Sequence, residues 1–394
     1  MKRTYYFFII IAMMLLAACS KTAEFRDPSG DDRSQPAMLS NAVVQNIAGG
    51  AKISYKLPND PGILYVKAVY TGSNGKEAEV KASYYTSSLV VQGFSDTNPH
   101  EVSLYTVSRN EVASQPVKVE IKPLKAPIFK VLESVDLYAA FGGYNLTARN
   151  TDSADVALII LKKNDLNEWE PDNNRSIYTS GSIISSQIRG LDAVEQTVAY
   201  FVRDRWGNRT DTVFKSVTPY FETLMDRSKY KSLPLPGDAP LLYGTVVTNM
   251  WDNRLSWPYV AFAETSAGPS MLTVDMGQIA QVSRIWWLAQ SDWNRYYLDR
   301  TMKKFEIYGS ANPNPNGALD DSWYLLGTYE IIKPSGLPYG TDNELDAATA
   351  RAGFSCDVDL KAPKVRYIRF RSFVNFVGTS GLAIDEFAAY GDNR

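Results

Sequence analysis

The 394-residue sequence has a single histidine, two cysteines and almost no net charge. With only His100, the chain cannot build a zinc site rich in histidine or the HExxH motif of metalloproteases. It has 41 Lys and Arg against 43 Asp and Glu, so it lacks the strongly basic balance that is typical of nucleic-acid binders. No GxSxG, GxGxxG or P-loop motif is present. We therefore expect no nucleic-acid partner and none of these enzyme classes.

The two cysteines, Cys19 and Cys356, are too few for a cysteine-rich metal site. If Cys19 is used in processing, Cys356 has no partner for an internal disulfide and is expected to be a small buried residue. A hydrophobic content of 45% and a charged content of 21% are typical of globular proteins. The length predicts two to four domains.

The N-terminus has the pattern of an export signal. Lys2 and Arg3 precede an uninterrupted apolar run over 5–18, which is shorter than the about 20 residues of a membrane-spanning helix. The run ends in Leu-Ala-Ala-Cys at 16–19, which resembles the lipobox of bacterial lipoproteins. That resemblance implies a signal peptide over 1–18 and a lipidated Cys19, which would anchor the chain stably in a membrane. An ordinary signal peptide with a chance cysteine is the alternative.

The part of the chain that follows is expected to be built from strands. Residues 19–37 are polar and predict a flexible tether. Period-two alternation of apolar and polar residues then recurs, as in 117–122, and no sustained helical periodicity is found. The spacing of the strands over 38–124 resembles a fibronectin type III sandwich, and 125–231 repeats the same pattern. Three prolines within 232–240 predict a linker.

The last part of the chain, 241–394, has a more specific pattern. Its motifs are Met-Leu-Thr-Val-Asp-Met-Gly at 271–277, Arg-Ile-Trp-Trp-Leu at 284–288, Phe-Glu-Ile-Tyr-Gly-Ser at 305–310, Arg-Tyr-Ile-Arg-Phe at 366–370 and Ile-Asp-Glu-Phe at 384–387. In this order they resemble the discoidin or coagulation factor 5/8 type C family. The resemblance implies a galactose-binding-like jelly roll. The predicted fold class is therefore all-β, with two Ig- or fibronectin III-like sandwiches followed by a jelly-roll sandwich.

The whole arrangement resembles the surface lipoproteins of Gram-negative bacteria that forage for glycans. It implies a non-catalytic lipoprotein of the outer membrane that faces the cell surface and binds an oligo- or polysaccharide through its C-terminal domain. The alternative is a structural or assembly subunit that contacts a TonB-dependent glycan importer through its sandwich domains. A glycosidase is a third possibility, but no pair of carboxylates lies in a recognisable catalytic motif, so we expect no enzyme.

Three loops are candidates for sugar binding, because sugars are recognised by aromatic rings and polar groups placed side by side. The loop over 290–300 combines aromatic, amide and charged side chains, and we expect its rings to form a shallow platform. Aromatic residues that pack under their own loops are the alternative interpretation. The predicted ligand-binding residues are Trp293, Asn294, Arg295, Tyr296, Tyr297, Trp257, Asn375 and Phe376.

The resemblance also implies a structural Ca²⁺, held by an early acidic turn and a glutamate near the C-terminus. Asp252, Asn253 and Ser256 would supply the turn, and Glu386 the C-terminal ligand, since hard cations need several oxygen ligands. The turn is shorter here than the family's usual motif, and Arg254 within it puts a positive charge where the calcium ion would sit. Without a metal, Asp252 and Glu386 would pair with Arg254 or cap a turn.

Overall fold

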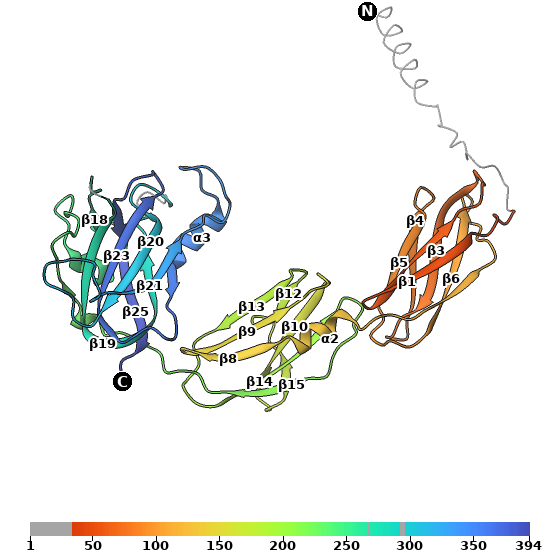
Figure 1. The fold of residues 1–394 in the computed structure, drawn as a ribbon, viewed down its shortest axis with the longest axis horizontal. Coiled ribbons are helices and arrows are strands. Elements are labelled where there is room, and N and C mark those ends of the chain that lie inside the picture. Colours follow the sequence, from red (N-terminus) through yellow and green to blue (C-terminus); the bar gives the residue numbers. More distant parts are fainter. Residues whose placement is uncertain (1–33, 267, 292–295) are drawn as a thin grey trace, which may run out of the picture.

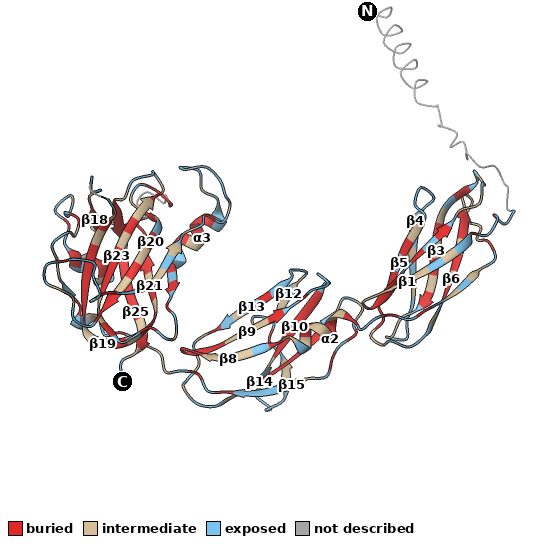
Figure 2. Cartoon of the chain, viewed as in Figure 1, coloured by how far each residue is buried: buried red, intermediate tan, exposed pale blue. Residues whose placement is uncertain are grey.

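The structure is a computed structural model that describes residues 34–266, 268–291 and 296–394. Within these residues the protein is all-β, with three successive sandwiches in a bent row (Figure 1). Each sandwich has its own hydrophobic core. Buried positions follow the inner faces of the strands, while the loops at the ends of each sandwich are largely exposed (Figure 2). The fold class predicted from the sequence is confirmed.

The first sandwich contains two antiparallel sheets. One sheet has the order β1-β2-β5 and the other has the order β4-β3-β6-β7. Apolar side chains on alternate positions of each strand fill the space between the sheets, as period-two patterning requires. The strands are β1 (Ser40–Ile47), β2 (Gly50–Lys56), β3 (Ile63–Thr71), β4 (Glu77–Ser83), β5 (Ser88–Gln92), β6 (His100–Ser108) and β7 (Val117–Ile121).

The second sandwich repeats this plan after the short helix α2 (Pro127–Glu133), which begins with a proline at its first turn. Its sheets have the orders β13-β9-β8 and β11-β10-β14-β15, and β12 also pairs with β10. The central strand β10 is buried on both faces, because a second small apolar cluster covers its outer side. The strands are β8 (Asp136–Ala140), β9 (Gly143–Arg149), β10 (Val156–Lys163), β11 (Trp169–Pro171), β12 (Ile177–Thr179), β13 (Ile183–Ile188), β14 (Gln196–Asp204) and β15 (Val213–Val217).

The C-terminal sandwich is arranged around one long strand, β19 (Ser270–Leu288). Two of the motifs of the sequence, at 271–277 and 284–288, lie on this strand. The first half of β19 pairs with β23, and the second half pairs with β25 and β22. The register shifts at Gly277, whose backbone has a φ of 65° and passes so close to the Lys229 carbonyl that a Cβ would lie 2.2 Å from its oxygen. Only glycine fits this approach without strain.

The main sheet of this domain has the order β16-β25-β19-β23-β20-β21, and β18 pairs with β24 in a second, two-stranded sheet. The helix α3 (Glu344–Ala352) packs against the same core. The other elements are β16 (Thr223–Leu224), the 3₁₀ turns η1 (Arg227–Lys229) and η2 (Val247–Trp251), β17 (Lys231–Ser232), β18 (Val260–Phe262), β20 (Met302–Ser310), β21 (Tyr324–Glu330), β22 (Phe354–Asp357), β23 (Val365–Asn375), β24 (Leu382–Ile384) and β25 (Glu386–Asp392).

The prolines of 232–240 do not form a free linker. The Ala239 N–H donates to the Met271 carbonyl at 2.8 Å, and Asp238 lies 3.4 Å from the buried guanidinium of Arg369. Arg369 is fully buried, although the alternation of its strand predicts a solvent-facing position. It needs partners for its charge, and the proline segment supplies one of them. The segment is therefore a covering layer of the C-terminal sandwich.

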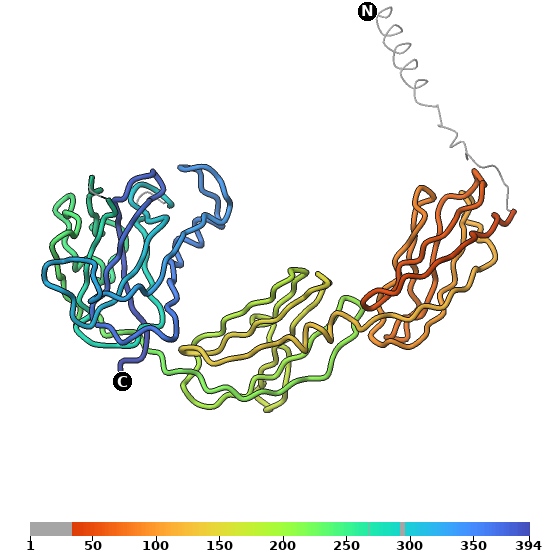
Figure 3. The backbone as a smooth tube through the Cα atoms, viewed as in Figure 1, coloured from red at the N-terminus to blue at the C-terminus, as the bar shows by residue number. Residues whose placement is uncertain are grey.

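The C-terminal domain also begins earlier than the sequence predicts. β16 pairs with β25 and β17 pairs with β19, so 223–232 belong to the sheets of this domain. Met225 and Tyr230 are both buried in its core. The connection between the second and third sandwiches is therefore the short stretch before β16, where the chain passes once between the two bodies (Figure 3).

Polar contacts join the second and third sandwiches at this connection. Arg189 lies 2.9 Å from Glu222 and 2.7 Å from Asp357, which is at the end of β22. The Glu222 carboxylate also accepts a hydrogen bond from Ser283 of β19. The Glu222 side chain is only 8% exposed, so removal of Arg189 would leave its buried carboxylate without this positive partner, whereas the Asp357 side chain is half exposed.

Candidate functional site

The loops between the strands gather at one end of the C-terminal sandwich. They are the segment before β18, the β18–β19 loop, the β19–β20 loop and the β23–β24 loop. The pairing of β18 with β24, and the hydrogen bond from the Ala383 N–H to the Arg300 carbonyl, bring these loops together. Loops at the end of a sandwich are free to carry binding groups, because the strands below them maintain the fold.

Three aromatic residues lie together at this end and form what we call the aromatic shelf: the exposed Tyr243 and Trp257 and the half-buried Tyr259. The Trp257 ring lies 6.4 Å from the Tyr243 ring and 5.4 Å from the Tyr259 ring, edge to face in each case. Tyr243 is 66% exposed and Trp257 is 52% exposed. Burying such rings in the core would be favourable, so two large aromatic faces left open to solvent mark a surface suited to a ligand.

Charged and hydroxyl groups lie beside the shelf and form what we call the polar rim: Glu264, Arg300 and Thr379. The Arg300 guanidinium lies 5.9 Å from the Tyr243 ring and 3.7 Å from the Glu264 carboxylate. Its Nε donates to the Phe262 carbonyl at 3.2 Å, which fixes its direction. The Thr379 hydroxyl donates to Glu264 at 3.4 Å. The Arg300 guanidinium therefore lies beside the exposed Tyr243 ring, with the Glu264 carboxylate and the Thr379 hydroxyl next to it.

The platform predicted from the 290–300 loop is not formed as expected. Trp293, Asn294 and Arg295 lie outside the described residues. Tyr296 and Tyr297 are both buried, at 5% and 1% exposure, so neither offers a face to a sugar. The prediction for these two tyrosines is wrong, because their rings complete the hydrophobic core under the loop.

The contacts of the two tyrosines explain their burial. The Tyr297 ring packs edge to face on Phe354 and Phe376, and it forms part of the wall of a cavity of about 490 Å³ that is also lined by 330–333. Burial, together with the charges of two nearby aspartates, raises the pKa of Tyr297 to about 12. The Tyr296 N–H donates to Asp342 at 3.0 Å. Both residues therefore anchor the loop to the domain.

Asn375 and Phe376 have structural roles as well. Asn375 is 1% exposed, and its side-chain amide donates to the Thr379 hydroxyl and the Gly381 carbonyl at 2.8 and 2.9 Å. These bonds close the β23–β24 turn, so Asn375 is not available to a ligand and that prediction is wrong. Phe376 is half-buried against Tyr297. Of the described residues predicted to bind ligand, Trp257 alone offers a largely exposed ring.

The four predicted calcium ligands do not form an open set of oxygens. The guanidinium of Arg227, in η1, donates to the Asn253 side chain at 2.8 Å and forms an ion pair with the buried carboxylate of Glu386. Asp252 accepts from the Arg254 N–H at 2.9 Å, and the Ser256 N–H donates to Asp385. A calcium ion between Asn253 and Glu386 would meet a fixed positive charge, so these residues do not fit Ca²⁺.

Burial governs the chemistry of the remaining reactive groups. Desolvation raises the pKa of the Cys356 thiol to about 12, so it stays protonated and inert, consistent with a packing role. In the described part of the chain, no group of three or more His, Cys, Asp or Glu side chains could hold a metal ion. No helix among these residues is long and apolar enough to span a membrane.

The sequence analysis missed Tyr243 and the polar rim. Tyr243 lies in a mostly apolar stretch, Leu-Leu-Tyr-Gly-Thr-Val-Val at 241–247, and its proximity to Trp257 depends on how the segment before β18 folds back over the sandwich. Arg300 lies inside the loop that the sequence singles out, but its partners come from the end of β18 and from the β18–β19 loop. Only long-range contacts could identify these residues as one group.

Comparison with protein families matches three successive parts of the chain. Three family models match it, each described as a domain of unknown function: DUF4959 over 36–123, DUF5126 over 124–228 and DUF5000 over 251–391. A search of curated proteins gives no match.

Among solved structures, a SusE-like protein is 26% identical, with a TM-score of 0.45, and the alignment covers 68% of this chain and 100% of that one. The CBM32-1 and CBM32-2 domains of ZmpB from Clostridium perfringens are 16% identical, with a TM-score of 0.30, over 43% of this chain and 37% of theirs. A two-domain fibronectin type III segment of chicken tenascin is 9% identical, with a TM-score of 0.21, over 46% of this chain and 99% of the segment.

Proposed function

We propose that this chain is a non-catalytic glycan-binding protein that captures carbohydrate through the loop end of its C-terminal sandwich. The observation that supports this function is the aromatic shelf beside the polar rim. The apolar C–H face of a sugar can stack on the exposed rings of Tyr243 and Trp257, while Arg300 and Glu264 bind its hydroxyls. Such recognition needs a ring and fixed polar groups side by side, and this end of the domain has both.

An open surface of this kind favours modest affinity. Little of the ligand is buried, and each neutral hydrogen bond contributes about 0.5–1.5 kcal/mol net. We expect dissociation constants of roughly 10 µM to 1 mM, equivalent to about −7 to −4 kcal/mol. Many copies on one surface would strengthen the capture of a polymer through multivalency.

The membrane anchor is the second part of the proposal. A lipidated Cys19 would attach the N-terminal end of the chain to the outer membrane, and the polar stretch after it would act as a tether. The aromatic shelf belongs to the domain at the opposite end of the row of sandwiches (Figure 1). This arrangement would hold the binding surface away from the membrane, as capture of an external polymer requires.

Replacing Trp257 by alanine should weaken glycan binding at least tenfold, which is about 1.4 kcal/mol. Because half of this side chain is already exposed, the melting temperature should change little. Binding to a glycan array, followed by titration calorimetry with the best ligand, measures both effects. A loss of stability by several kcal/mol would show instead that Trp257 belongs to the core.

Tyr324 provides the matched control for this experiment. It is also an exposed aromatic residue of the C-terminal domain, but it pairs with Gly309 at the far end of β20, away from the loops. Tyr324→Ala should bind glycans like the unchanged protein. If no glycan binds the folded chain at all, an assembly role next to an importer would be favoured over capture.

Replacing Cys19 by alanine should release the chain from membranes, because acylation at this position would supply its only predicted anchor. Fractionation of cells into soluble and membrane pools, with detection of a lipid-modified N-terminus by mass spectrometry, measures the effect. Membrane association that is unchanged in Cys19→Ala would contradict the lipoprotein proposal.

A further inference from the structure

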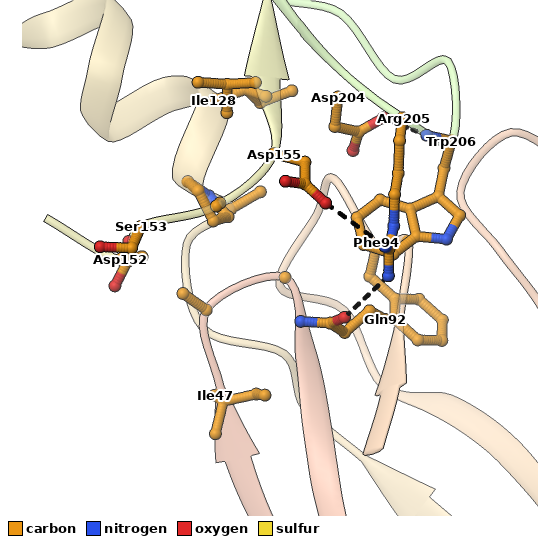
Figure 4. A pocket seen from close by; sticks show the side chains of 17 residues that line it. Ile47, Gln92, Phe94, Ile128, Asp152, Ser153, Asp155, Asp204, Arg205 and Trp206 are labelled. Carbon is orange, nitrogen blue, oxygen red and sulfur yellow. Dashed lines mark hydrogen bonds and ion pairs between the residues drawn. The ribbon is translucent and has the colours of Figure 1, made fainter. Parts of the chain in front are cut away.

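A pocket of about 420 Å³ lies at the junction of the first two sandwiches, far along the chain from the aromatic shelf. Its walls come from both domains: 47–49 and 92–94 of the first, and 126–128, 152–156 and 204–206 of the second (Figure 4). The volume falls in the lower part of the range of about 300–1,000 Å³ that is typical of small-ligand sites.

Three polar side chains at this pocket are only weakly held by the protein itself. The Arg205 guanidinium lies between Asp155 and Gln92, at 3.4 Å from the carboxylate and 3.5 Å from the amide oxygen (Figure 4). Both distances are at the outer limit of hydrogen bonding. The side chains of Arg205 and Asp155 are each more than half exposed, so their pairing contributes little to stability. These groups can turn to a ligand at small cost.

The other carboxylates of the pocket are engaged within the protein. Asp152 forms an ion pair with Lys130 at 3.0 Å. Asp204 accepts from the backbone N–H groups of Trp206 and Asn208, both at 2.9 Å, and so closes the turn after β14. One positive and one negative group are therefore left for a ligand. Their balance favours a neutral ligand with several hydroxyls over a phosphate, a uronate or a cation.

The junction has a fixed shape around these groups. The Trp206 ring lies so close to Gly93 that a Cβ there would be 3.2 Å from the indole, and the Arg205 guanidinium lies 4.4 Å from the ring centroid. Asn208 donates to the Gly93 carbonyl at 3.1 Å, and Asn74 donates to the Trp206 carbonyl at 2.9 Å. A pocket whose walls are already in place loses less entropy on binding than a mobile one.

We propose that this junction pocket is a second carbohydrate-binding site, which takes a neutral sugar unit bonded to Arg205, Asp155 and Gln92. The choice of a sugar as ligand rests on the proposed function, whereas the pocket and its charges do not depend on it. Gln92 belongs to the first sandwich and the other two residues to the second. A bound sugar therefore bridges the two domains and stabilises their docked arrangement, by an amount that grows with the logarithm of its concentration above the dissociation constant.

Hydrogen exchange of the full chain, read by mass spectrometry, tests the site. The probes are neutral oligosaccharides of two to six glucose, galactose, mannose or xylose units, with trigalacturonate as the anionic comparison. In the unchanged protein we expect a neutral oligosaccharide to protect both the 243–259 segment and the junction segments 92–94 and 204–208. In Asp155→Ala and in Arg205→Ala, half-maximal protection of the junction should need at least ten times more ligand. Protection of the 243–259 segment should be unaffected.

Arg175→Ala is the matched control, since Arg175 is a partly exposed arginine of the same sandwich, paired with Asp172, that does not line this pocket. It should leave both protections unchanged. Protection of 243–259 without protection of the junction overturns the second site alone, and protection of the junction alone overturns the proposed role of the aromatic shelf. Protection of neither overturns both, and stronger protection by trigalacturonate overturns the assignment of a neutral ligand.

Discussion

A fragment that starts at residue 235 should fail to fold cooperatively, whereas a fragment over 221–394 should give a single sharp unfolding transition. The prolines at 232–240 suggest a natural place to divide the chain, but residues before them complete the C-terminal core. Tyr230 is buried between Phe387 and Trp251, at 5.6 Å from each ring, and Met225 is fully buried. Truncation at 235 removes both.

The expected size of this effect follows from the groups that are lost. Removal of a buried methionine costs about 2–5 kcal/mol and removal of a large aromatic side chain about 3–5 kcal/mol. The shorter fragment also leaves the buried Glu386 carboxylate without Arg227, which costs a further amount of about 3–5 kcal/mol. The total reaches the about 5–15 kcal/mol that stabilises a whole domain.

Thermal unfolding of the two fragments, followed by circular dichroism and calorimetry, measures the difference. The fragment over 221–394 serves as the control, because it retains β16, β17 and η1 together with the partners of Glu386. A cooperative transition of equal midpoint in both fragments would contradict the assignment of 223–232 to the C-terminal core.

Arg227→Ala should destabilise the C-terminal domain by about 3–5 kcal/mol at pH 7, because it leaves the buried Glu386 carboxylate without its positive partner. In a domain of this size that loss lowers the melting temperature by roughly 10 °C. Lys304→Ala is the matched control. Lys304 pairs with Glu330 at 3.6 Å in an exposed position, so its removal should cost less than about 1 kcal/mol.

The pH dependence of the Arg227→Ala effect distinguishes a lost charge pair from lost packing. Burial raises the pKa of Glu386 above its usual value, while Arg227 acts in the opposite direction. Stability linked to an acid with a raised pKa is present at low pH and is lost as the pH rises through the folded-state pKa. Without Arg227 that pKa rises further, so the penalty should grow from pH 4 to pH 8.

Replacing Glu386 by glutamine in the Arg227→Ala background completes the test. The double variant has no buried charge, so it should recover part of the lost stability and lose the pH dependence between pH 4 and pH 8. A penalty that is the same at pH 4 and pH 8 in Arg227→Ala alone would show that Arg227 stabilises the domain through packing instead.

The sequence by itself determined the strands and the fold class. Alternating apolar residues place β7 where the pattern predicts it, since a strand with one buried face has apolar residues at every second position. The domain boundary depended on contacts that the pattern does not contain. The prolines of 232–240 correctly indicate irregular backbone, but the Asp238–Arg369 contact decides that this backbone covers a sheet.

The candidate site was decided almost entirely by the tertiary structure. A cluster of aromatic residues in a polar loop has the same sequence signature whether its rings face solvent or the core. Tyr297 packs inward on Phe354 and Phe376, and Tyr296 next to it is also buried, whereas the Trp257 ring lies at the surface, edge to face with Tyr243 and Tyr259. Two of the residues expected to bind calcium, Asn253 and Glu386, contact Arg227 instead. Arg227 lies more than twenty residues before Asn253 and reaches Glu386 only in the folded chain. Burial and charge pairing join residues far apart in sequence, and a local pattern does not encode them.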